Sequence, residues 1–261
     1  MAGNPVYGAL RSGLFTRVVG KRLLYFQELG STMDEAARRA EAGTEEGTVV
    51  VAETQTAGRG RFGRSWVSQK GNLYLSVVFR PDQHVLPLLT ALSGVAVARA
   101  IRKTTGLEPR IKWPNDILLD GKKVAGILVE SVAAGEKVYY AVVGIGINVS
   151  LDAAGIEELS GLATGLDAAV GRPVAREELL RQLLQDLDAL YYQANQRRSP
   201  LAEWESLLDT LGQRVQVTWR DETWVGQAEA VDQGGNLLLR LDDGQLVTMT
   251  AGDVTMHDTS P

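Results

Sequence analysis

Three arginines lie close together in a glycine-rich segment, residues 58–64 (GRGRFGR). Glycine lets the backbone approach a ligand closely and keeps a loop mobile. In an extended stretch the side chains of Arg59 and Arg61 point to the same side, where two guanidinium groups can bind phosphate or carboxylate. Because loops are generally polar and exposed, an ordinary surface loop explains the segment equally well when it is taken alone.

The same segment matches the pattern G-x-G-x-x-G, which marks a dinucleotide site only when a strand precedes it and a helix opens within it. Here the glycines lie in the middle of a long polar stretch, residues 54–70, and a strand follows. The pattern therefore does not indicate a dinucleotide site. Loops of this length inside compact domains are often functional.

A second polar group comprises residues 112–116 (KWPND) and Lys123. Pro, Asn and Asp favour turns, and a lysine at a strand start commonly faces solvent, so each feature is ordinary alone. Together with the arginines they suit one reaction, in which a carboxylate attacks the α-phosphate of ATP. Both reactants are anions, so the protein must supply cations and a closing loop that keeps water from the mixed anhydride.

The composition excludes other chemistries. The chain of 261 residues has no cysteine, and its two histidines lack a zinc-site spacing, so thiol nucleophiles, disulfides and Cys-based zinc sites are ruled out. No G-x-S-x-G elbow supports a serine triad. A net charge of −5 disfavours general affinity for nucleic acid or anionic membranes. Without a long apolar run or a signal peptide, we expect a cytoplasmic protein.

Hydrophobic periodicity predicts the elements that position these residues. Ser31 is expected to cap a helix that ends at Gly43, and Asp120-Gly121 to form a hairpin turn. Residues 1–20 are compatible with one short helix, and residues 155–171 are expected to be a loop. Further helices are expected at residues 88–101, 176–192 and 201–208, and strands at residues 48–52, 73–79, 110–113, 117–119, 124–130 and 137–149.

Near Thr210 the pattern changes to short strands separated by Gly- and Asp-rich turns, at residues 214–219, 223–231, 236–241 and 245–249. We therefore expect an α+β fold. Residues 1–209 would form a catalytic domain with a mixed or antiparallel sheet and helices packed on it. Residues 210–261 would form a small SH3-like β-barrel.

Several short motifs follow one another along the chain: Gly30-Ser31-Thr32, Glu53 to Arg61, Trp66, Lys112 to Asp116, Lys123 to Glu130 and Gly144 to Asn148. Their order and spacing resemble those of biotin–protein ligases. The resemblance is dense over residues 25–150 and looser through Ala163-Thr164 and the helix from Arg176. It implies the fold just described, a catalytic domain followed by an SH3-like domain.

The resemblance also implies the site residues. The implied catalytic residues are Lys123, Arg59 and Arg61. Those that bind biotin or biotinyl-AMP are Ser31, Thr32, Gln55, Gly58, Arg59, Gly60, Arg61, Trp66, Lys123 and Gly126, and those near the adenine are Asn115, Asp116 and Asn148. Ser31, Thr32 and Gln55 would hydrogen-bond the ureido ring.

Several assignments keep an alternative. Ser31 can act as a helix cap alone, and Trp66 is equally well explained as a packing residue. The family often has Asn where this chain has Met33, and a thioether cannot replace an amide. Some members have an arginine in the last strand of the small domain, where His257 is the nearest counterpart here, so no role is carried onto it.

The implied enzyme is a biotin–protein ligase that converts biotin and Mg-ATP to biotinyl-5'-AMP and pyrophosphate. It then transfers biotin to a lysine of a biotin carboxyl carrier domain, in acetyl-CoA carboxylase or a related carboxylase. Mg²⁺ would arrive on the ATP phosphates, with no separate metal site. The chain lacks room for the DNA-binding domain of longer members, so we expect no nucleic-acid or membrane partner, and a monomer or homodimer. The alternatives are a lipoate or octanoyl ligase or transferase, and a non-enzymatic binding module.

Overall fold

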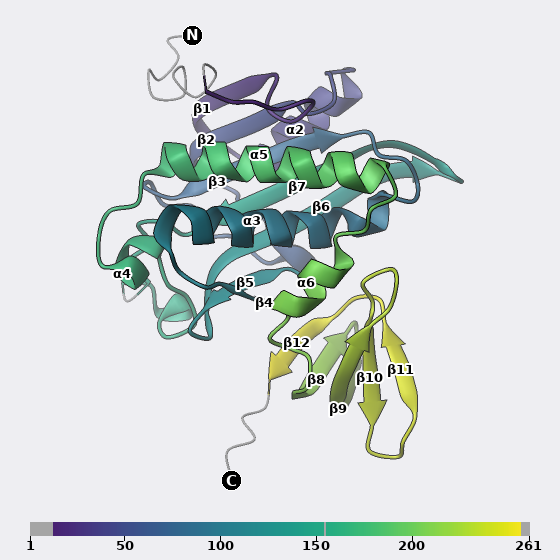
Figure 1. Cartoon of the computed structure of the whole chain (residues 1–261). Helices are drawn as coiled ribbons and strands as arrows, with labels where there is room; N and C mark the ends of the chain where they lie inside the picture. The colour runs from purple at the N-terminus through teal and green to yellow at the C-terminus, as the bar shows by residue number, and fades with distance from the viewer. Residues whose placement is uncertain (1–12, 154, 257–261) are drawn as a thin grey trace.

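The computed structural model describes residues 13–153 and 155–256, which form two β-sheets (Figure 1). The larger sheet has the strand order β1-β2-β3-β7-β6-β5-β4. The β1–β2 pair is parallel and the other pairs are antiparallel, so the predicted mixed sheet is confirmed. Its strands are β1 (Leu23–Leu29), β2 (Val49–Gln55), β3 (Leu73–Phe79), β4 (Arg110–Lys112), β5 (Asp116–Leu119), β6 (Lys122–Ala134) and β7 (Lys137–Ile147).

Helices cover both faces of this sheet. On one face α3 (Leu89–Thr105) and α5 (Arg176–Asn195) run side by side (Figure 1), and the leucine stripe of α5 is buried there. On the other face α2 (Thr32–Glu41) packs against valines of β2, β3 and β7. The remaining short elements are α4 (Leu166–Val170), α6 (Leu201–Leu207) and the 3₁₀ turns η1 (Arg61–Gly63), η2 (Leu86–Leu88) and η3 (Glu157–Leu159).

Two local signals act as predicted. Ser31 caps α2, because its Oγ accepts a hydrogen bond from the backbone N–H of Met33 at 3.2 Å. The chain leaves this helix at Gly43, where φ is 81°. The β5–β6 hairpin turns at Asp120 and Gly121, whose φ angles of 48° and 75° fit the positive-φ turn that Asp-Gly favours.

The second sheet is antiparallel with the order β11-β10-β9-β8-β12. It is joined to the first through the β4–β5 turn, where Trp113 donates from Nε1 to the carbonyl of Gly235 at 2.9 Å. The backbone N–H of Trp113 also donates to Thr210 Oγ1 at 2.9 Å. Its strands are β8 (Arg214–Trp219), β9 (Glu222–Val231), β10 (Leu237–Leu241), β11 (Leu246–Met249) and β12 (Asp253–Met256).

Some elements differ from the sequence-based expectation. The strands β1 and β12 were not predicted. The expected loop at residues 155–171 contains η3 and α4. The expected short helix at residues 1–20 lies partly outside the described residues, and residues 13–20 form turns and bends instead. They are held there by Asp188, whose carboxylate accepts hydrogen bonds from three consecutive backbone N–H groups, those of residues 17–19.

Among the helices in the described part of the chain, none combines the length and the apolar character that crossing a bilayer demands.

Candidate active site

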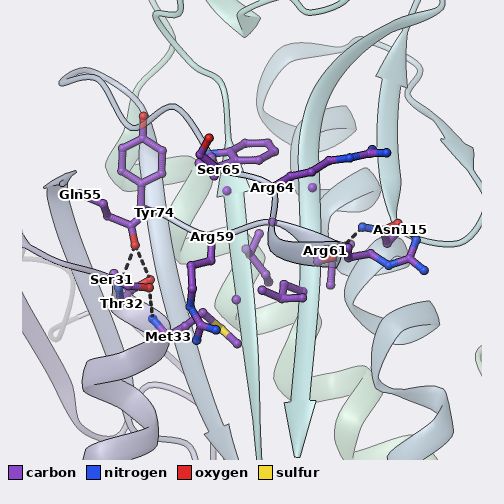
Figure 2. A pocket seen from close by; sticks show the side chains of 18 of the residues that line it. Ser31, Thr32, Met33, Gln55, Arg59, Arg61, Arg64, Ser65, Tyr74 and Asn115 are labelled. Carbon is purple, nitrogen blue, oxygen red and sulfur yellow. Dashed lines mark hydrogen bonds between the residues drawn. The ribbon is translucent and has the colours of Figure 1, made fainter. Parts of the chain in front are cut away.

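A cleft opens on the α2 face of the larger sheet, bounded by the segment that carries the arginines (Figure 2). We name residues 56–70, which join β2 to β3, the arginine loop. The cleft has a volume of about 770 Å³ when its open mouth is included. The predicted site residues that line it are Ser31, Thr32, Gln55, Arg59, Gly60, Arg61, Trp66, Asn115, Asp116, Lys123 and Gly126.

One end of the cleft is a hydrogen-bond network around Gln55 (Figure 2). Its Oε1 accepts from the backbone N–H and the hydroxyl of Thr32, at 2.8 and 3.0 Å. Ser76 Oγ in turn donates to Thr32 Oγ1 at 2.8 Å, and Gln55 Nε2 donates to Ser68 Oγ at 3.0 Å. Because each polar group here holds the next one, this polar end is oriented before a ligand arrives.

Arg59 is held by two carboxylates. It donates to both oxygens of Glu130 at 2.9 Å, and Asp34 Oδ1 lies 2.8 Å from its Nη2. Figure 2 shows Arg59 directed toward the Met33 end of the cleft, whereas Arg61 is directed toward Asn115. The prediction that the two arginines point to the same side is therefore wrong, because the chain is not extended there: Arg61 begins the turn η1.

Arg61 is half-buried between the two sheets. Its Nη1 donates to Asn115 Oδ1 at 3.0 Å and to the carbonyl of Gly252 at 3.2 Å. Burial lowers the pKa of the guanidinium, and the carboxylates of Asp253 and Asp116 act in the opposite direction. An arginine side chain nevertheless stays protonated in proteins, so this wall of the cleft carries a fixed positive charge.

Two lysines share one carboxylate at the same end. Lys123 Nζ lies 2.7 Å from Asp116 Oδ1, and Lys112 Nζ lies 3.8 Å from Asp116 Oδ2. With Arg61 and the ion pair of Arg64 with Asp253, this end contains four cations and two anions. An excess of positive charge remains after the ion pairs are formed, and it is available to an anionic ligand.

The Trp66 indole lies on the strand backbones between the two ends. A Cβ at Gly126 would come within 2.9 Å of the indole, and one at Gly146 within 2.6 Å. These paired glycines of β6 and β7 therefore leave the space that the ring occupies. Lys123 Nζ lies 5.2 Å from the ring centroid, a distance at which a cation is attracted to an aromatic face.

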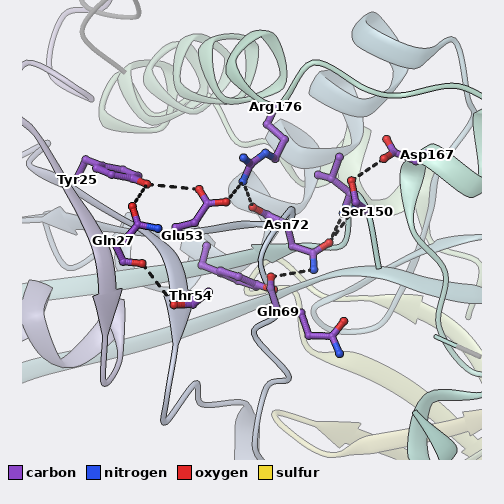
Figure 3. A network of polar contacts seen from close by, with 11 residues as sticks. Tyr25, Gln27, Glu53, Thr54, Gln69, Asn72, Ser150, Asp167 and Arg176 are labelled. Carbon is purple, nitrogen blue, oxygen red and sulfur yellow. Dashed lines mark hydrogen bonds and ion pairs between the residues drawn. The ribbon is translucent and has the colours of Figure 1, made fainter. Parts of the chain in front are cut away.

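A buried ion pair lies at the base of the arginine loop (Figure 3). Arg176 donates to Glu53 Oε1 and to the carbonyl of Asn72, both at 3.0 Å, and Glu53 is 3% exposed. The side chain of Asn72 accepts from the backbone N–H groups of Val149 and Ser150 at 2.8 and 3.0 Å. The two ends of the arginine loop and the segment after β7 are thus fixed to α5 by one polar network.

The cleft can therefore hold a molecule with a polar head at one end and an anionic group at the other, across an apolar middle section. In the part of the chain that the structure describes, no group of three or more His, Cys, Asp or Glu side chains is placed to hold a metal ion.

Comparison with known proteins agrees with this geometry. The sequence profile of the Biotin/lipoate A/B protein ligase family matches residues 24–148, and that of the Biotin protein ligase C terminal domain matches residues 210–256. The bifunctional ligase/repressor BirA of Bacillus subtilis is 38% identical over 241 residues, which cover 90% of this chain and 74% of that protein. This chain belongs to the biotin protein ligase family.

Two further biotin protein ligases are similar over most of their length. The biotin–[acetyl-CoA-carboxylase] ligase of Mycobacterium tuberculosis is 35% identical over 239 residues, which cover 87% of this chain and 86% of that one. The structure of biotin protein ligase from Aquifex aeolicus in complex with biotin and ATP matches with a TM-score of 0.78. It is 30% identical, and the match covers 91% of this chain and 99% of that chain.

Two predicted site residues of this biotin protein ligase do not line the cleft. A Cβ at Gly58 would lie 2.6 Å from the carbonyl oxygen of Trp66 and from Ser68 Oγ, so this glycine allows the arginine loop to fold back on itself. Asn148 is buried, and its side chain donates to the carbonyl of Lys123 at 3.4 Å. Asn148 therefore contacts the lysine's backbone from behind the cleft.

Several residues that were not predicted as site residues also line the cleft. Met33 places its thioether beside Gly144, where an added Cβ would lie 2.5 Å from the sulfur. The residue that departs from the family pattern therefore forms part of the cleft floor. Asp253 comes from the second sheet, and no local pattern could bring it here. The others are Arg64, Ser65, Tyr74, Leu75, Ile127, Leu128, Gly144, Ile145 and Gly146.

Proposed function

We propose that this biotin protein ligase acts in two steps. In the first, a carboxylate oxygen of biotin bonds to the α-phosphorus of ATP, the bond to the β-phosphate oxygen breaks, and pyrophosphate leaves. In the second, the ε-amine of a carrier-protein lysine bonds to the carbonyl carbon of biotinyl-5'-AMP. The carbon–oxygen bond to AMP then breaks, and the amine loses a proton.

The single observation that carries the proposal is the division of the cleft into a polar end and a cationic end. Biotin has the same division, because a ureido ring with two N–H groups and one carbonyl lies opposite its carboxylate. We place the ring beside Ser31, Thr32 and Gln55, whose side chains can donate and accept. The carboxylate then lies toward Lys123 and Arg61.

In the first step the protein's main task is electrostatic. Two anions must approach, and charge develops on the phosphorus oxygens. Lys123, Lys112 and Arg61 supply positive charge that is already in place, and such preorganised charge is commonly the largest contribution to catalysis. Asn115 holds Arg61 through the hydrogen bond described above. Mg²⁺ is proposed to arrive with the ATP phosphates, because this ion is usually held by substrate phosphates, waters and one or two carboxylates.

Trp66 and the arginine loop would exclude water. A mixed anhydride hydrolyses when solvent reaches it, so a loop that closes over the adenylate preserves it for the amine. Arg59 would join the closed state by exchanging Asp34 and Glu130 for the ligand. We propose that Gly58 and Gly60 contribute backbone to this loop and that Asp116 pairs with Lys123. Asn148 would support the part of the site that holds the adenine.

The proposed partner is a lysine on a biotin carboxyl carrier domain of acetyl-CoA carboxylase or a related carboxylase, in the cytoplasm. We also propose that residues 1–209 form the catalytic domain and residues 210–261 an SH3-like domain.

A lipoate or octanoyl ligase is the alternative within the same protein family. A plain acyl chain presents no hydrogen-bonding group to the network around Gln55, and it would bury the donors and acceptors that the network leaves free, at about 1–3 kcal/mol each. The polar end therefore favours biotin.

Pyrophosphate exchange tests the proposal. The protein is incubated with Mg-ATP, labelled pyrophosphate and either biotin or lipoate, and labelled ATP is measured. We expect exchange with biotin only. Exchange with lipoate only would identify the chain as a lipoate ligase instead, and exchange with neither acid would exclude the ligase mechanism.

A further inference from the structure

The arginine loop is attached to the second sheet at three consecutive points of contact. Arg61 donates to the carbonyl of Gly252 at 3.2 Å. The guanidinium of Arg64 forms an ion pair with the carboxylate of Asp253. Between them, the Phe62 ring meets the Trp219 ring edge to face, with centroids 5.6 Å apart and an interplanar angle of 65°. The loop that lines the cleft of one sheet thus rests on the other sheet at its edge strand β12 and the neighbouring strand β8.

Phe62 has an unusual position for an aromatic residue. It is 51% exposed and adopts the left-handed conformation, with φ 55° and ψ 35°, which is unfavourable for a bulky side chain. Strained backbone persists where the surroundings compensate for it, and it is concentrated at functional segments. The turn at Phe62 and Gly63 places the ring against Trp219, and this contact is an evident compensation.

The same turn determines where Arg61 points. Because η1 begins at Arg61, a displacement of Phe62 would rotate the residue before it. One Nη1 atom of Arg61 contacts both the cleft residue Asn115 and the second-sheet residue Gly252. The guanidinium of Arg61 therefore lines the cleft and at the same time attaches the arginine loop to the second sheet.

We propose that the second sheet is the docking platform of the arginine loop, with Trp219 as a positioning residue for Arg61. The proposal rests on the proposed ligase function. Trp219 is not among the residues that line the cleft, so it acts through Phe62 and not on the ligand. The docked loop covers the adenylate, and loss of the Phe62–Trp219 contact shortens the time for which the adenylate is retained.

The test measures the release of labelled biotinyl-AMP from the full-length protein. The adenylate is formed from labelled biotin and Mg-ATP, the complex is separated from free nucleotide, and dissociation is followed in Phe62→Ala, Trp219→Ala and the double variant. An edge-to-face pair contributes about 0.5–1.5 kcal/mol, so each single variant should release the adenylate roughly 2- to 12-fold faster. The double variant should be no faster than the faster single variant, since the Phe62–Trp219 contact is already lost in each single variant.

Two controls separate docking from general damage. Tyr139→Ala removes another exposed aromatic side chain, 45% exposed, from the β6–β7 hairpin and should release the adenylate at the wild-type rate. Trp219→Phe should restore retention, because it keeps an aromatic partner for Phe62. The Phe62 variant leaves the second sheet intact and thus reports on docking even where Trp219→Ala lowers stability.

Wild-type release rates in Phe62→Ala and Trp219→Ala would overturn the docking proposal, and so would effects that multiply in the double variant. Failure of the wild-type protein to form any adenylate would be a different result, since it would contradict the proposed function itself.

Discussion

The polar end of the cleft and the side chain of Arg59 on the arginine loop are held in different ways. The polar end consists of buried or half-buried groups on β2, β3 and the start of α2, and its hydrogen bonds run from one protein group to the next. Arg59 is held instead by exposed ion pairs, in which Arg59, Glu130 and Asp34 are 39%, 43% and 64% exposed. Exposed pairs contribute little to stability, whereas buried networks hold their groups rigidly.

This difference separates recognition from chemistry. A rigid polar end can select the head group of the substrate without rearrangement. An arginine held by weak pairs can exchange its carboxylate partners for an anionic ligand at small cost. Lys123 lies between these extremes: its ammonium is paired with Asp116, but its backbone is fixed on β6, next to the segment at Leu162 and Thr164. Four sets of variants test the comparison.

The largest effect is expected for Lys123→Ala. Removing one preorganised group that stabilises developing charge typically costs about 10²–10³ in rate, so biotin-dependent pyrophosphate exchange should fall by about that factor. Lys122→Ala removes the exposed neighbouring lysine and serves as the matched control. Equal losses in both variants would show that general surface charge, and not this position, matters.

The next effect concerns stability. Glu53→Ala leaves Arg176 without its buried carboxylate, and breaking a buried pair typically costs about 3–5 kcal/mol. Urea denaturation should show a loss of about 3 kcal/mol in the free energy of unfolding. Glu130→Ala removes an exposed carboxylate and should cost less than about 1 kcal/mol. Similar losses in the two variants would contradict the distinction between a rigid base and a loosely held loop.

Gln55→Ala should weaken biotin recognition. The change leaves Thr32 without its partner and removes the amide proposed for the ureido ring, at about 1–3 kcal/mol per unpaired group. The KM for biotin in the exchange assay should rise roughly tenfold or more, while the KM for ATP changes little. Gln27→Ala, at an exposed position of β1, is the control. A rise in the KM for ATP alone would place biotin's ring elsewhere.

The smallest effect is expected for the double variant Asp34→Asn with Glu130→Gln. It neutralises both partners of Arg59, so stability should change by less than about 1 kcal/mol. The KM for ATP should fall slightly, because Arg59 no longer has to leave two carboxylates. A large loss of stability would mean that the loop is fixed as firmly as the polar end.

Local patterns predicted much of the fold. The strand at Leu73–Phe79 and the turn at Asp120-Gly121 formed where apolar β-branched residues and a turn dipeptide required them. β1 was not predicted, because Gln27 and Glu28 interrupt its apolar pattern and its partner β2 lies beyond an intervening helix. β12 was not predicted either, because it pairs with β8, from which three strands separate it in the chain, and no hairpin turn marks that pairing.

Many of the residues that line the cleft could be predicted from the sequence, but the directions of their side chains could not. Motif order brought Gln55, the arginines and Lys123 together, and the structure places them around one cleft. The divergence of Arg59 and Arg61 depends on the left-handed turn at Phe62, which no pattern indicates. The second-sheet residue Asp253 enters the cleft through the packing of the two sheets, and such packing has no local signal.

The most direct test of the account is a crystal structure of this protein with bound biotinyl-5'-AMP. We expect the ureido ring in hydrogen-bond contact with Thr32 and Gln55, and the phosphate next to Lys123 and Arg61. The opposite orientation, or a phosphate far from both cations, would contradict the division of the cleft into a recognition end and a reaction end.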